Sequence, residues 1–578
     1  MVIDVCFSRD GVNFTEPRTI ACGPGEGFTS AAPWVVTLPD GRIAVSYQSD
    51  NHHQTPHPTS EGNYKQLNVA ISKTAVTYGD HSSISTADFE YYRPFDSFNS
   101  DVTYNYWNCL FIDGYKLYAL GAVSSNKNSV TPSRGIVTAE VDLAPEGTPE
   151  GYTPICTAND MLNLMNRQSG FCWENEKYYL VNDIDLSEAT NGLSQRPIGY
   201  QNVNGCKFGG VFDGNGKTIR GIDITSSGKF AGLFGYVIHG EIKDLTLYGS
   251  VSGTYAASDR KSNGAGGLCG FANGRTVLSG INSYVEVNAV STAGGIVGYI
   301  LRNGSAGNVV IKNCANYGKV SSSATSASGA AGGIVGCIAA ASADVQILDC
   351  ENYGAVSGYQ YAGGIVGASS TESSGTHYTV VERCTNYGSV AAKVQDVGGI
   401  YGLAWYTKIS DCINKGQITN KKTANALGAG IVGRAHQYSS ISRCVNYGVV
   451  YSSGSSILGS KSLGTGVTLG DCYYIEGCAA DEKATMIALG AKAEQSSYVG
   501  YDFLNTFEIK DGELCVIDRY SLRVGDVDAD GVITNADIAL FVRVLSGWND
   551  AHSIESLDVN ADEKINNRDI LALIIKLS

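Results

Sequence analysis

Four aspartates fall within twelve residues near the end of the sequence, in the stretch DVDADGVITNAD at residues 526–537. Carboxylates stand at positions 1, 3, 5 and 12 of this window, and the glycine at position 6 permits a sharp turn. A calcium-binding loop of this length takes oxygen ligands at positions 1, 3, 5, 7, 9 and 12, with a backbone carbonyl at position 7. The residues expected to bind Ca²⁺ here are Asp526, Asp528, Asp530, Val532, Thr534 and Asp537.

A related window, DVNADEKINNRD, returns at residues 558–569, 32 residues after the first. Glu563 replaces the glycine at position 6, so we expect this second loop to bind Ca²⁺ more weakly. An acidic surface loop is the alternative interpretation. The repeated spacing favours two Ca²⁺ sites, because aspartates at this spacing would repel one another without a cation. The expected ligands of the second site are Asp558, Asn560, Asp562, Lys564 through its carbonyl, Asn566 and Asp569.

Each window is followed by an apolar run at helical spacing, whereas the segment CVIDRYSLRVG before the first window has the pattern of a strand. The unit is therefore a loop followed by one helix. This duplicated unit resembles a type I dockerin over residues 524–578. The resemblance implies a small α-helical calcium-binding domain that docks onto a cohesin module of a scaffoldin, in an extracellular cellulosome. It also implies cohesin contacts at positions 10 and 11 of the two loops, which are Asn535, Ala536, Asn567 and Arg568.

The composition argues against two classes of protein. A net charge of −15 does not suit a protein that binds nucleic acid, and no run of 18 apolar residues predicts a membrane span. Seventy glycines and 34 tyrosines, with only 17% charged residues, are typical of extracellular β-proteins. The first residues, MVIDVCFSRDG, lack the basic and apolar regions of a signal peptide, so we expect the chain to be an N-terminally truncated secreted protein.

Two short phrases recur through the middle of the sequence with a period of roughly 30 residues. The first is GGIVG, at residues 294, 332 and 363, with variants at 398 and 429, and the second is C-x-N-Y-G, at residues 314, 350, 384 and 444, with CINKG at 412. The apolar runs are short and β-branched and end in glycine turns, which predicts a parallel β-solenoid rather than helical repeats. We place this solenoid at residues 157–478.

If each coil places the second phrase alike, its cysteines and asparagines stack about 4.8 Å apart, at the spacing of neighbouring strands. An asparagine stack can satisfy its own amide groups inside a buried turn. The cysteines are expected to be reduced and to point inward, although disulfides and a metal site are alternatives. The tyrosines of the phrase, Tyr317, Tyr353, Tyr387 and Tyr447, either stack on sugar rings or pack against one another from coil to coil. The acids Asp344, Asp349, Asp396 and Asp411 are scattered and out of phase, which argues against a catalytic face.

The phrases resemble the GLUG-type repeat of bacterial surface and secreted proteins, over about residues 157–520. TANDMLNLMNR at residues 157–167 predicts an amphipathic helix that caps the solenoid's first strand edge, and DGNG at residues 213–216 predicts a tight turn. Residues 479–523, which include YDFLNTFEIKDGELCVID, are expected to form the C-terminal cap with a closing hairpin.

Residues 1–143 alternate in the manner of short strands, with turns at residues 39–41 and 113–114 that predict hairpins. SRDGVNF at residues 8–14 resembles a shortened Asp-box of sialidase-like and exo-arabinanase-like β-propellers. This length holds two to three blades, so the resemblance implies an incomplete propeller. Asp50, at the end of a strand, is the one weak catalytic candidate. Residues 144–156 are expected to be a linker.

The fold expected overall is mostly β: incomplete propeller blades, then a parallel β-solenoid, then a small helical calcium-binding domain. The function expected is that of a secreted, cellulosome-associated protein of plant polysaccharide degradation, docked through its calcium-dependent domain. Whether it is an enzyme stays open; if it is, it is a glycoside hydrolase. The alternative is a non-catalytic solenoid that binds carbohydrate or a cell surface. The partners expected are a cohesin and a plant polysaccharide.

Overall fold

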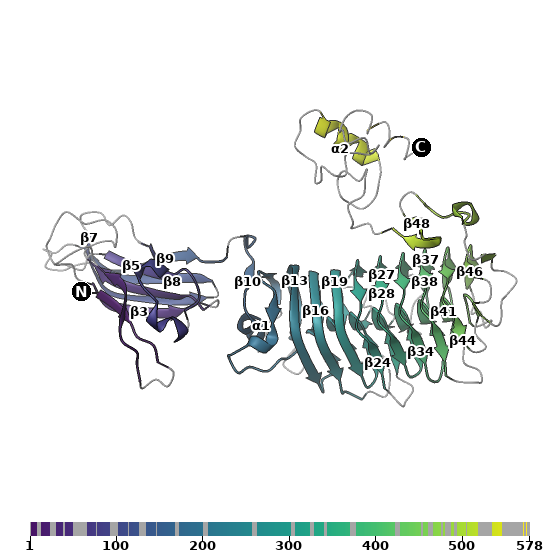
Figure 1. Cartoon of the computed structure of the whole chain (residues 1–578), viewed down its shortest axis with the longest axis horizontal. Coiled ribbons are helices and arrows are strands. Elements are labelled where there is room, and N and C mark those ends of the chain that lie inside the picture. Colours follow the sequence, from purple (N-terminus) through teal and green to yellow (C-terminus); the bar gives the residue numbers. More distant parts are fainter. Residues whose placement is uncertain are drawn as a thin grey trace. The chain divides into compact units, whose positions relative to one another are not determined.

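A computed structural model covers the chain (Figure 1). The residues that it describes are 2–8, 13–22, 30–38, 41–49, 66–76, 78–92, 102–113, 115–125, 134–145, 147–167, 173–199, 206–256, 263–301, 307–323, 329–339, 344–369, 377–421, 428–451, 455–459, 466–475, 478–479, 487–489, 494–503, 506–517, 535–545, 570 and 574. The chain divides into two compact units. The first comprises residues 1–161, 177–184 and 189–191, and the second comprises residues 162–176, 185–188 and 192–578.

The first unit is built from antiparallel sheets. Four strands pair in chain order, β3 (Ser30–Thr37), β4 (Ile43–Ser49), β5 (Gln66–Ser72) and β6 (Phe89–Tyr92). Three more pair likewise, β7 (Val102–Asp113), β8 (Lys116–Ser125) and β9 (Arg134–Asp142), and β1 (Val2–Val5) pairs with β2 (Arg18–Cys22). Both predicted hairpins are confirmed, since β3 turns into β4 after Thr37 and β7 turns into β8 after Asp113.

Alternate residues of these strands form the first unit's core. Leu38, Val69, Ile71, Leu110 and Leu117 are each 3% exposed or less and pack in one cluster. The structure shows meandering antiparallel sheets here, and the propeller interpretation stays a prediction. Ser8 and Phe14, the two ends of the segment that resembles an Asp-box, form an antiparallel bridge. Asp50 lies outside the described residues.

The structure places β10 (Thr153–Ile155) inside the predicted linker, followed by helix α1 (Ala158–Asn166), β11 (Trp173–Leu180) and β12 (Ile184–Asp185). The predicted helix is confirmed, and its apolar residues Met161, Leu162, Leu164 and Met165 are buried. Thr157 and Asp160 cap its start, because Asp160 Oδ2 accepts from the Thr157 amide at 2.9 Å while the Asp160 amide donates to Thr157 Oγ1 at 3.2 Å. The predicted linker is not wholly irregular, since β10 pairs in parallel with β11.

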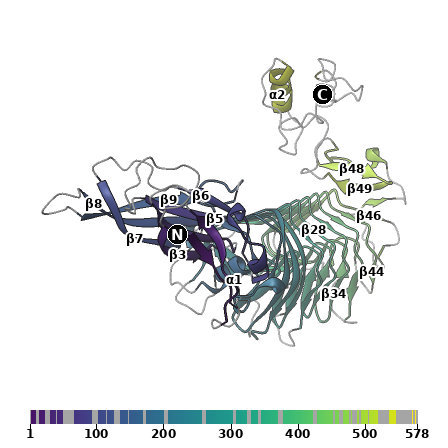
Figure 2. The same cartoon turned by 60° about the vertical axis from the view of Figure 1, so that its left-hand side comes forward.

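The second unit is dominated by a parallel β-solenoid, which confirms the predicted fold (Figures 1 and 2). Successive coils stack their strands into five columns. Three long early strands, β13 (Phe208–Ser226), β16 (Glu241–Gly253) and β19 (Val277–Ala289), pair in parallel with one another and run through the third, fourth and fifth columns.

The first column holds β14 (Phe230–Ala231), β17 (Gly264–Gly266), β20 (Thr292–Gly294), β25 (Ala330–Gly332), β30 (Tyr361–Gly363), β35 (Val397–Gly398) and β40 (Gly428–Ala429). The second holds β15 (Phe234–Ile238), β18 (Cys269–Asn273), β21 (Val297–Leu301), β26 (Val335–Ala339), β31 (Val366–Ser369), β36 (Tyr401–Ala404) and β41 (Val432–Ala435). The third holds β22 (Val309–Lys312), β27 (Val345–Leu348), β32 (Thr379–Glu382), β37 (Thr407–Ser410), β42 (Ser440–Ser442) and β45 (Thr468–Gly470).

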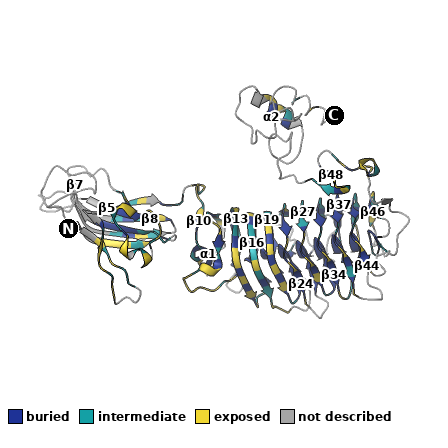
Figure 3. Ribbon diagram, viewed as in Figure 1, coloured by how far each residue is buried: buried dark blue, intermediate teal, exposed yellow. Residues whose placement is uncertain are grey.

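The fourth column holds the shortest strands, β23 (Ala315–Asn316), β28 (Glu351–Asn352), β33 (Thr385–Asn386), β38 (Ile413–Asn414), β43 (Val445–Asn446), β46 (Tyr473–Ile475) and β47 (Ile487–Leu489). The fifth holds β24 (Val320–Ser322), β29 (Val356–Gly358), β34 (Val390–Ala392), β39 (Ile418–Asn420) and β44 (Val450–Tyr451). The apolar residues of GGIVG point into the solenoid, where the strands are buried along most of their length (Figure 3). Burial of these β-branched side chains from coil to coil is what stabilises the stack.

Two details at the solenoid's ends are informative. The predicted tight turn at residues 213–216 is not a hairpin; it is a bulge inside β13, where the register shifts between Asp213 and Lys217 and Asn215 has φ 51°. The strand therefore continues because both of its flanks still pair with β16. The predicted closing hairpin is confirmed as β48 (Phe507–Lys510) and β49 (Glu513–Val516). No helix among the described residues is long and apolar enough to cross a membrane.

Candidate functional site

The asparagines of C-x-N-Y-G form the predicted buried stack along the fourth column. In each of four steps the Nδ2 of one asparagine donates to the Oδ1 of the next at 2.8 Å, through Asn316, Asn352, Asn386, Asn414 and Asn446. Each Nδ2 also donates to the carbonyl of the glycine two residues on, at 2.8 to 3.0 Å. The five side chains are fully buried, so these bonds replace the water that the amides lose on folding.

The same contact explains the double glycine of GGIVG. A Cβ added to Gly364 would lie 2.0 Å from the Gly399 carbonyl oxygen and 2.3 Å from Cγ of Asn386. The equivalent glycines of the neighbouring coils, Gly333 and Gly399, each meet the corresponding glycine carbonyl oxygen and asparagine Cγ at similar distances. The two phrases recur together because the asparagine of one occupies the space that the glycine of the other leaves open.

Replacing an asparagine inside the stack should destabilise the solenoid more than replacing the first one. Asn386→Ala removes the acceptor of Asn352 and the donor to Asn414 and to Gly388, which should cost about 3 kcal/mol of unfolding free energy. Asn316 Oδ1 has no partner among the described residues, so Asn316→Ala should cost about 1 kcal/mol less. Chemical denaturation followed by circular dichroism measures both variants, and equal losses would contradict the cooperative stack.

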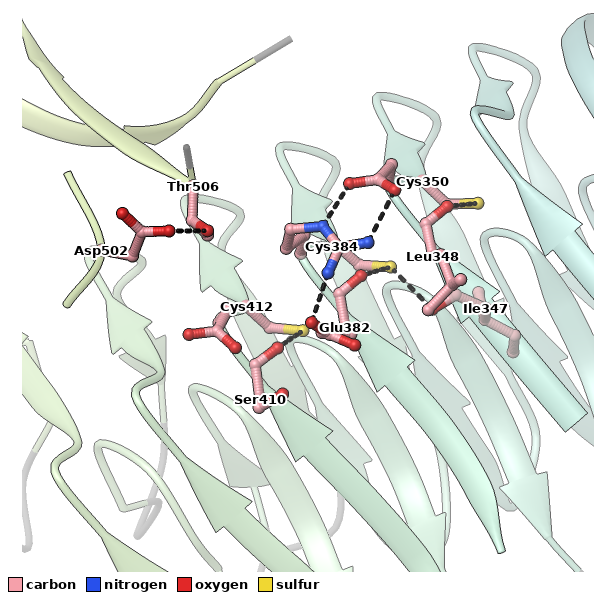
Figure 4. Close-up of polar contacts among 12 residues, drawn as sticks. Ile347, Leu348, Cys350, Glu382, Cys384, Ser410, Cys412, Asp502 and Thr506 are labelled. Carbon is pink, nitrogen blue, oxygen red and sulfur yellow. Dashed lines mark hydrogen bonds and ion pairs between the residues drawn. The ribbon is translucent and has the colours of Figure 1, made fainter. Parts of the chain in front are cut away.

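The cysteines of the same phrase point inward and are free thiols, as expected. Cys314, Cys350, Cys384, Cys412, Cys444 and Cys472 are all buried, and Figure 4 shows Cys350, Cys384 and Cys412 following one another along the column. The Sγ of Cys350 lies 3.2 Å from the carbonyl oxygen of Leu348, and that of Cys412 lies 3.1 Å from the carbonyl oxygen of Ser410. Burial raises the pKa of Cys350 and Cys412, so these thiols stay protonated and donate.

Thiol titration should find these six cysteines protected in the native protein and reactive after denaturation without reductant. The expected count of newly reactive thiols is at least six, because no disulfide joins the described cysteines and each of the six is 4% exposed or less. Ellman's reagent added before and after guanidinium measures the difference. Fewer than three reactive thiols in the denatured protein would mean that disulfides link the coils.

Tyrosine side chains of successive coils stack on one another. Ring centroids lie 4.3 to 4.8 Å apart, with planes within 6° of parallel, through Tyr248, Tyr284, Tyr317, Tyr353 and Tyr387. Arg220 covers the first ring with its guanidinium carbon 4.5 Å from the centroid, and Lys415, which replaces tyrosine in CINKG, lies 5.6 Å from the centroid of the last. Lys415 also lies 5.7 Å from the centroid of Tyr447.

This stack matches the packing alternative that the sequence left open for these tyrosines. Both faces of each ring from Tyr248 to Tyr387 are covered by another ring or by a cation, so solvent meets ring edges and hydroxyl groups. Tyr317 is 38% exposed and Tyr353 40% exposed. Burial raises the pKa of Tyr387 to about 12, so its hydroxyl remains a donor at neutral pH.

The residues that precede the cysteines of C-x-N-Y-G form a polar corner, which the sequence analysis missed. Asn313, Asp349, Arg383, Asp411 and Arg443 all have φ between 48° and 57°, a left-handed conformation that asparagine and aspartate tolerate best. The expectation that Asp349 and Asp411 are out of phase is wrong, because they occupy the same corner two coils apart, with Arg383 in the coil between them. The signal was present in the sequence as the alternation N-D-R-D-R one residue before Cys.

Bidentate ion pairs hold this corner together. Arg383 bonds Asp349 through Nε at 2.6 Å and Nη2 at 2.9 Å, and Arg443 bonds Asp411 at 2.6 and 2.7 Å. Arg383 also pairs with Glu382, and the side chains of Arg383 and Asp349 are only 11% and 14% exposed. These contacts link neighbouring coils and offset the strain of arginine in a left-handed conformation.

A groove of about 400 Å³ lies between the polar corner and the tyrosine stack. Its lining residues include Asn313, Asp349 and Arg383 of the polar corner and Tyr317 and Tyr353 of the tyrosine stack. The other lining residues are Asn282, Cys314, Ala315, Glu351, Thr385, Val516 and Ile517. The Tyr353 hydroxyl donates to Glu351 at 2.8 Å, which fixes that carboxylate at the groove's side.

At the C-terminal end, the structure describes helix α2 (Asn535–Leu545), in agreement with the helix predicted after the first loop. Asn535 and Ala536 are its first two residues, and Asp537, position 12 of the first loop, is fully buried in its first turn. The other expected ligands of both loops, and Asn567 and Arg568, lie outside the described residues. A carboxylate buried this deeply is held by hydrogen bonds, a cation or a metal ion, and the all-oxygen ligand set is the one that Ca²⁺ prefers.

Comparison with family models decides the character of this segment, because residues 524–578 match the dockerin type I domain. Residues 524–578 are a type I dockerin domain. Type I dockerin domains bind calcium, so Ca²⁺ is a cofactor of this chain. The dockerin implies a cohesin partner and an extracellular cellulosome-type assembly.

The remaining comparisons add little to the dockerin. No curated protein matches the chain. Among solved structures, a Bacteroides ovatus protein described as a "putative immunoglobulin A1 protease" is similar to 63% of this chain and 92% of its own, with 18% sequence identity and a TM-score of 0.41. Similarity at that level carries no argument about this chain's fold or activity.

Proposed function

We propose that this protein is a cohesin-docked component of plant polysaccharide degradation, in which the dockerin anchors a solenoid and an N-terminal unit of exo-glycosidase-like propeller blades. The observation that carries the proposal is the dockerin match over residues 524–578. Two Ca²⁺ sites, one in each loop, are proposed for this domain, with Asn535, Ala536, Asn567 and Arg568 at the cohesin interface.

The rest of the chain supports a role in handling carbohydrate. The antiparallel sheets of the first unit are consistent with sialidase-like or exo-arabinanase-like blades, and the repeats of the solenoid with the GLUG type. A solenoid stabilised by stacked side chains offers a long, rigid support, so that groups on its surface keep a fixed spacing from coil to coil.

Two measurements on the full chain test this proposal. A type I cohesin should be bound in Ca²⁺ and released by chelator, and insoluble plant polysaccharide should deplete the chain from solution. A matched chain that ends at residue 523 should lose the first interaction and keep the second. Failure of the full chain to bind any cohesin of a type I panel would contradict docking, and failure to adsorb to any polysaccharide would contradict the carbohydrate role.

A non-catalytic binding role is the second candidate, and the polar groove beside the tyrosine stack favours it. Hydrolysis of arabinan, aryl arabinosides and aryl sialosides separates the two roles, with Asp50→Asn as the control for the propeller residues. If the chain hydrolyses one of these substrates and Asp50→Asn abolishes the turnover, the first unit holds a glycosidase site. Adsorption without turnover makes the protein a carbohydrate-binding component.

A further inference from the structure

We propose that the groove on the fourth column of the solenoid binds a neutral oligosaccharide; this rests on the proposed role in polysaccharide degradation and assigns its binding site. The groove has a volume of about 400 Å³, which is within the size range of small-molecule sites, and its lining residues come from four successive coils and the C-terminal hairpin. It is thus a surface feature that a single coil could not make.

The C-terminal hairpin packs on the later part of this column and stops at the groove. The residue after each of the six stacked cysteines points outward. In the last three coils these residues are Ile413, Val445 and Tyr473, and each is 1% exposed or less. These three pack in one cluster with Phe507 and Leu514 of the C-terminal hairpin.

In the groove the equivalent residues are Ala315, Glu351 and Thr385, which are small or polar and do not belong to that cluster. The hairpin's cover ends at Val516 and Ile517, which stand at the edge of the groove. The residue after the cysteine thus changes from apolar to small or polar at the point where the hairpin stops covering the column. A column built only for packing would have no reason to change there.

The chemistry of the groove suits a polyhydroxylated, uncharged ligand. Arg383 is the only cation among the described lining residues, and its guanidinium is already engaged by Asp349 and Glu382. An anionic polymer would find no cation left to pair with, and it would meet Glu351. The Glu351 carboxylate and the tyrosine hydroxyls are acceptors and donors that sugar hydroxyls can bond.

Recognition in this groove depends on hydrogen bonds and ring edges. The faces of Tyr317 and Tyr353 are covered by their neighbours in the stack, at centroid distances of 4.3 to 4.8 Å, so no sugar ring can lie on them. The stack instead fixes the position of each hydroxyl. A row of fixed donors and acceptors, one set per coil about 4.8 Å apart, matches a ligand that is itself a chain of repeating units.

Isothermal titration calorimetry of the full chain tests the proposal with cellohexaose, xylohexaose, mannohexaose and arabinohexaose, and with an oligogalacturonide as the anionic comparison. We expect at least one neutral hexasaccharide to bind and the oligogalacturonide to bind more weakly. Glu351→Gln and Tyr353→Phe should each weaken binding roughly tenfold, since each removes a hydrogen bond at the groove's side. Ala315→Met, which fills the floor, should abolish binding.

Glu286→Gln is the matched control, because Glu286 is an exposed glutamate of β19 that does not line the groove. It should leave the affinity unchanged. Glu351→Gln and Tyr353→Phe preserve side-chain shape and keep the test valid if Ala315→Met fails to fold; thermal melts identify that case.

Three results would overturn the proposal. The first is that the wild-type chain binds none of the neutral hexasaccharides. The second is that it binds the oligogalacturonide more tightly than it binds them. Groove variants that bind as the wild type does would show that carbohydrate binds elsewhere on the chain. In that last case the proposed role in polysaccharide degradation stands while this site falls.

Discussion

Removing Ca²⁺ should unfold residues 524–578 and abolish binding of the chain to a type I cohesin. The loops place seven acidic side chains among twelve ligand positions, and without a cation their mutual repulsion opposes the fold. Since Ca²⁺ binds only the folded domain, free Ca²⁺ at about a thousand times its dissociation constant contributes about 4 kcal/mol to the domain's stability. Cohesin affinity of the full chain, measured with Ca²⁺ and with chelator, gives the first readout.

Circular dichroism of the segment 524–578 gives the second readout, with helicity that rises as Ca²⁺ is added. Equal helicity with and without chelator would contradict calcium-dependent folding. The two loops serve as controls for each other. Asp526→Ala should weaken calcium-dependent folding more than Asp558→Ala, because Glu563 occupies the position where the first loop has Gly531. The reverse order would show that this glutamate does not impair the second loop.

Gly364→Ala should destabilise the solenoid by about 3 kcal/mol, the upper end of the range for overpacking a close-packed interior. The added Cβ would lie 2.0 Å from the Gly399 carbonyl oxygen and 2.3 Å from Cγ of Asn386. Asn386 is held by the stack, so its side chain cannot move aside without breaking its hydrogen bonds to Asn352 and Asn414. Guanidinium denaturation followed by the far-ultraviolet signal measures the loss.

Gly470→Ala is the matched control, because a Cβ at Gly470 would have nothing within 4 Å. It should change the unfolding free energy by less than about 0.5 kcal/mol, as a substitution away from close contacts does. A double variant, Gly364→Ala with Asn386→Ala, should lose less than the sum of the two single losses, since removing the amide relieves part of the clash. Additive losses would show that the glycine and the asparagine do not share one contact.

The parts of the structure that repeat were predictable because repetition averages out local ambiguity. One GGIVG could begin a strand or a turn, but five in phase with Cys and Asn require coils in register. The asparagine stack followed from the same reasoning, because a buried amide in every coil has only its neighbours to bond. Helix α1 and the hairpins at residues 39–41 and 113–114 followed from local patterns alone.

The calcium-binding character of residues 524–578 was likewise set by the sequence, since the ligands of such a loop lie within twelve consecutive residues and their spacing survives in any fold. The bulge at Asn215 was not predictable, because DGNG also suits a hairpin, and only the pairing of both flanks with β16 decides between them.

Tertiary structure alone decided what lies beside what across the coils. The sequence showed Asp349 and Arg383 some thirty residues apart, and the stacking of coils turned them into a bidentate ion pair. The same stacking covered the faces of the tyrosines, and the C-terminal hairpin decided which part of the fourth column stays open as a groove. Spacing along the sequence is enough to identify calcium ligands that lie close together in the chain. A groove lined by four coils and a distant hairpin exists only after the chain has folded.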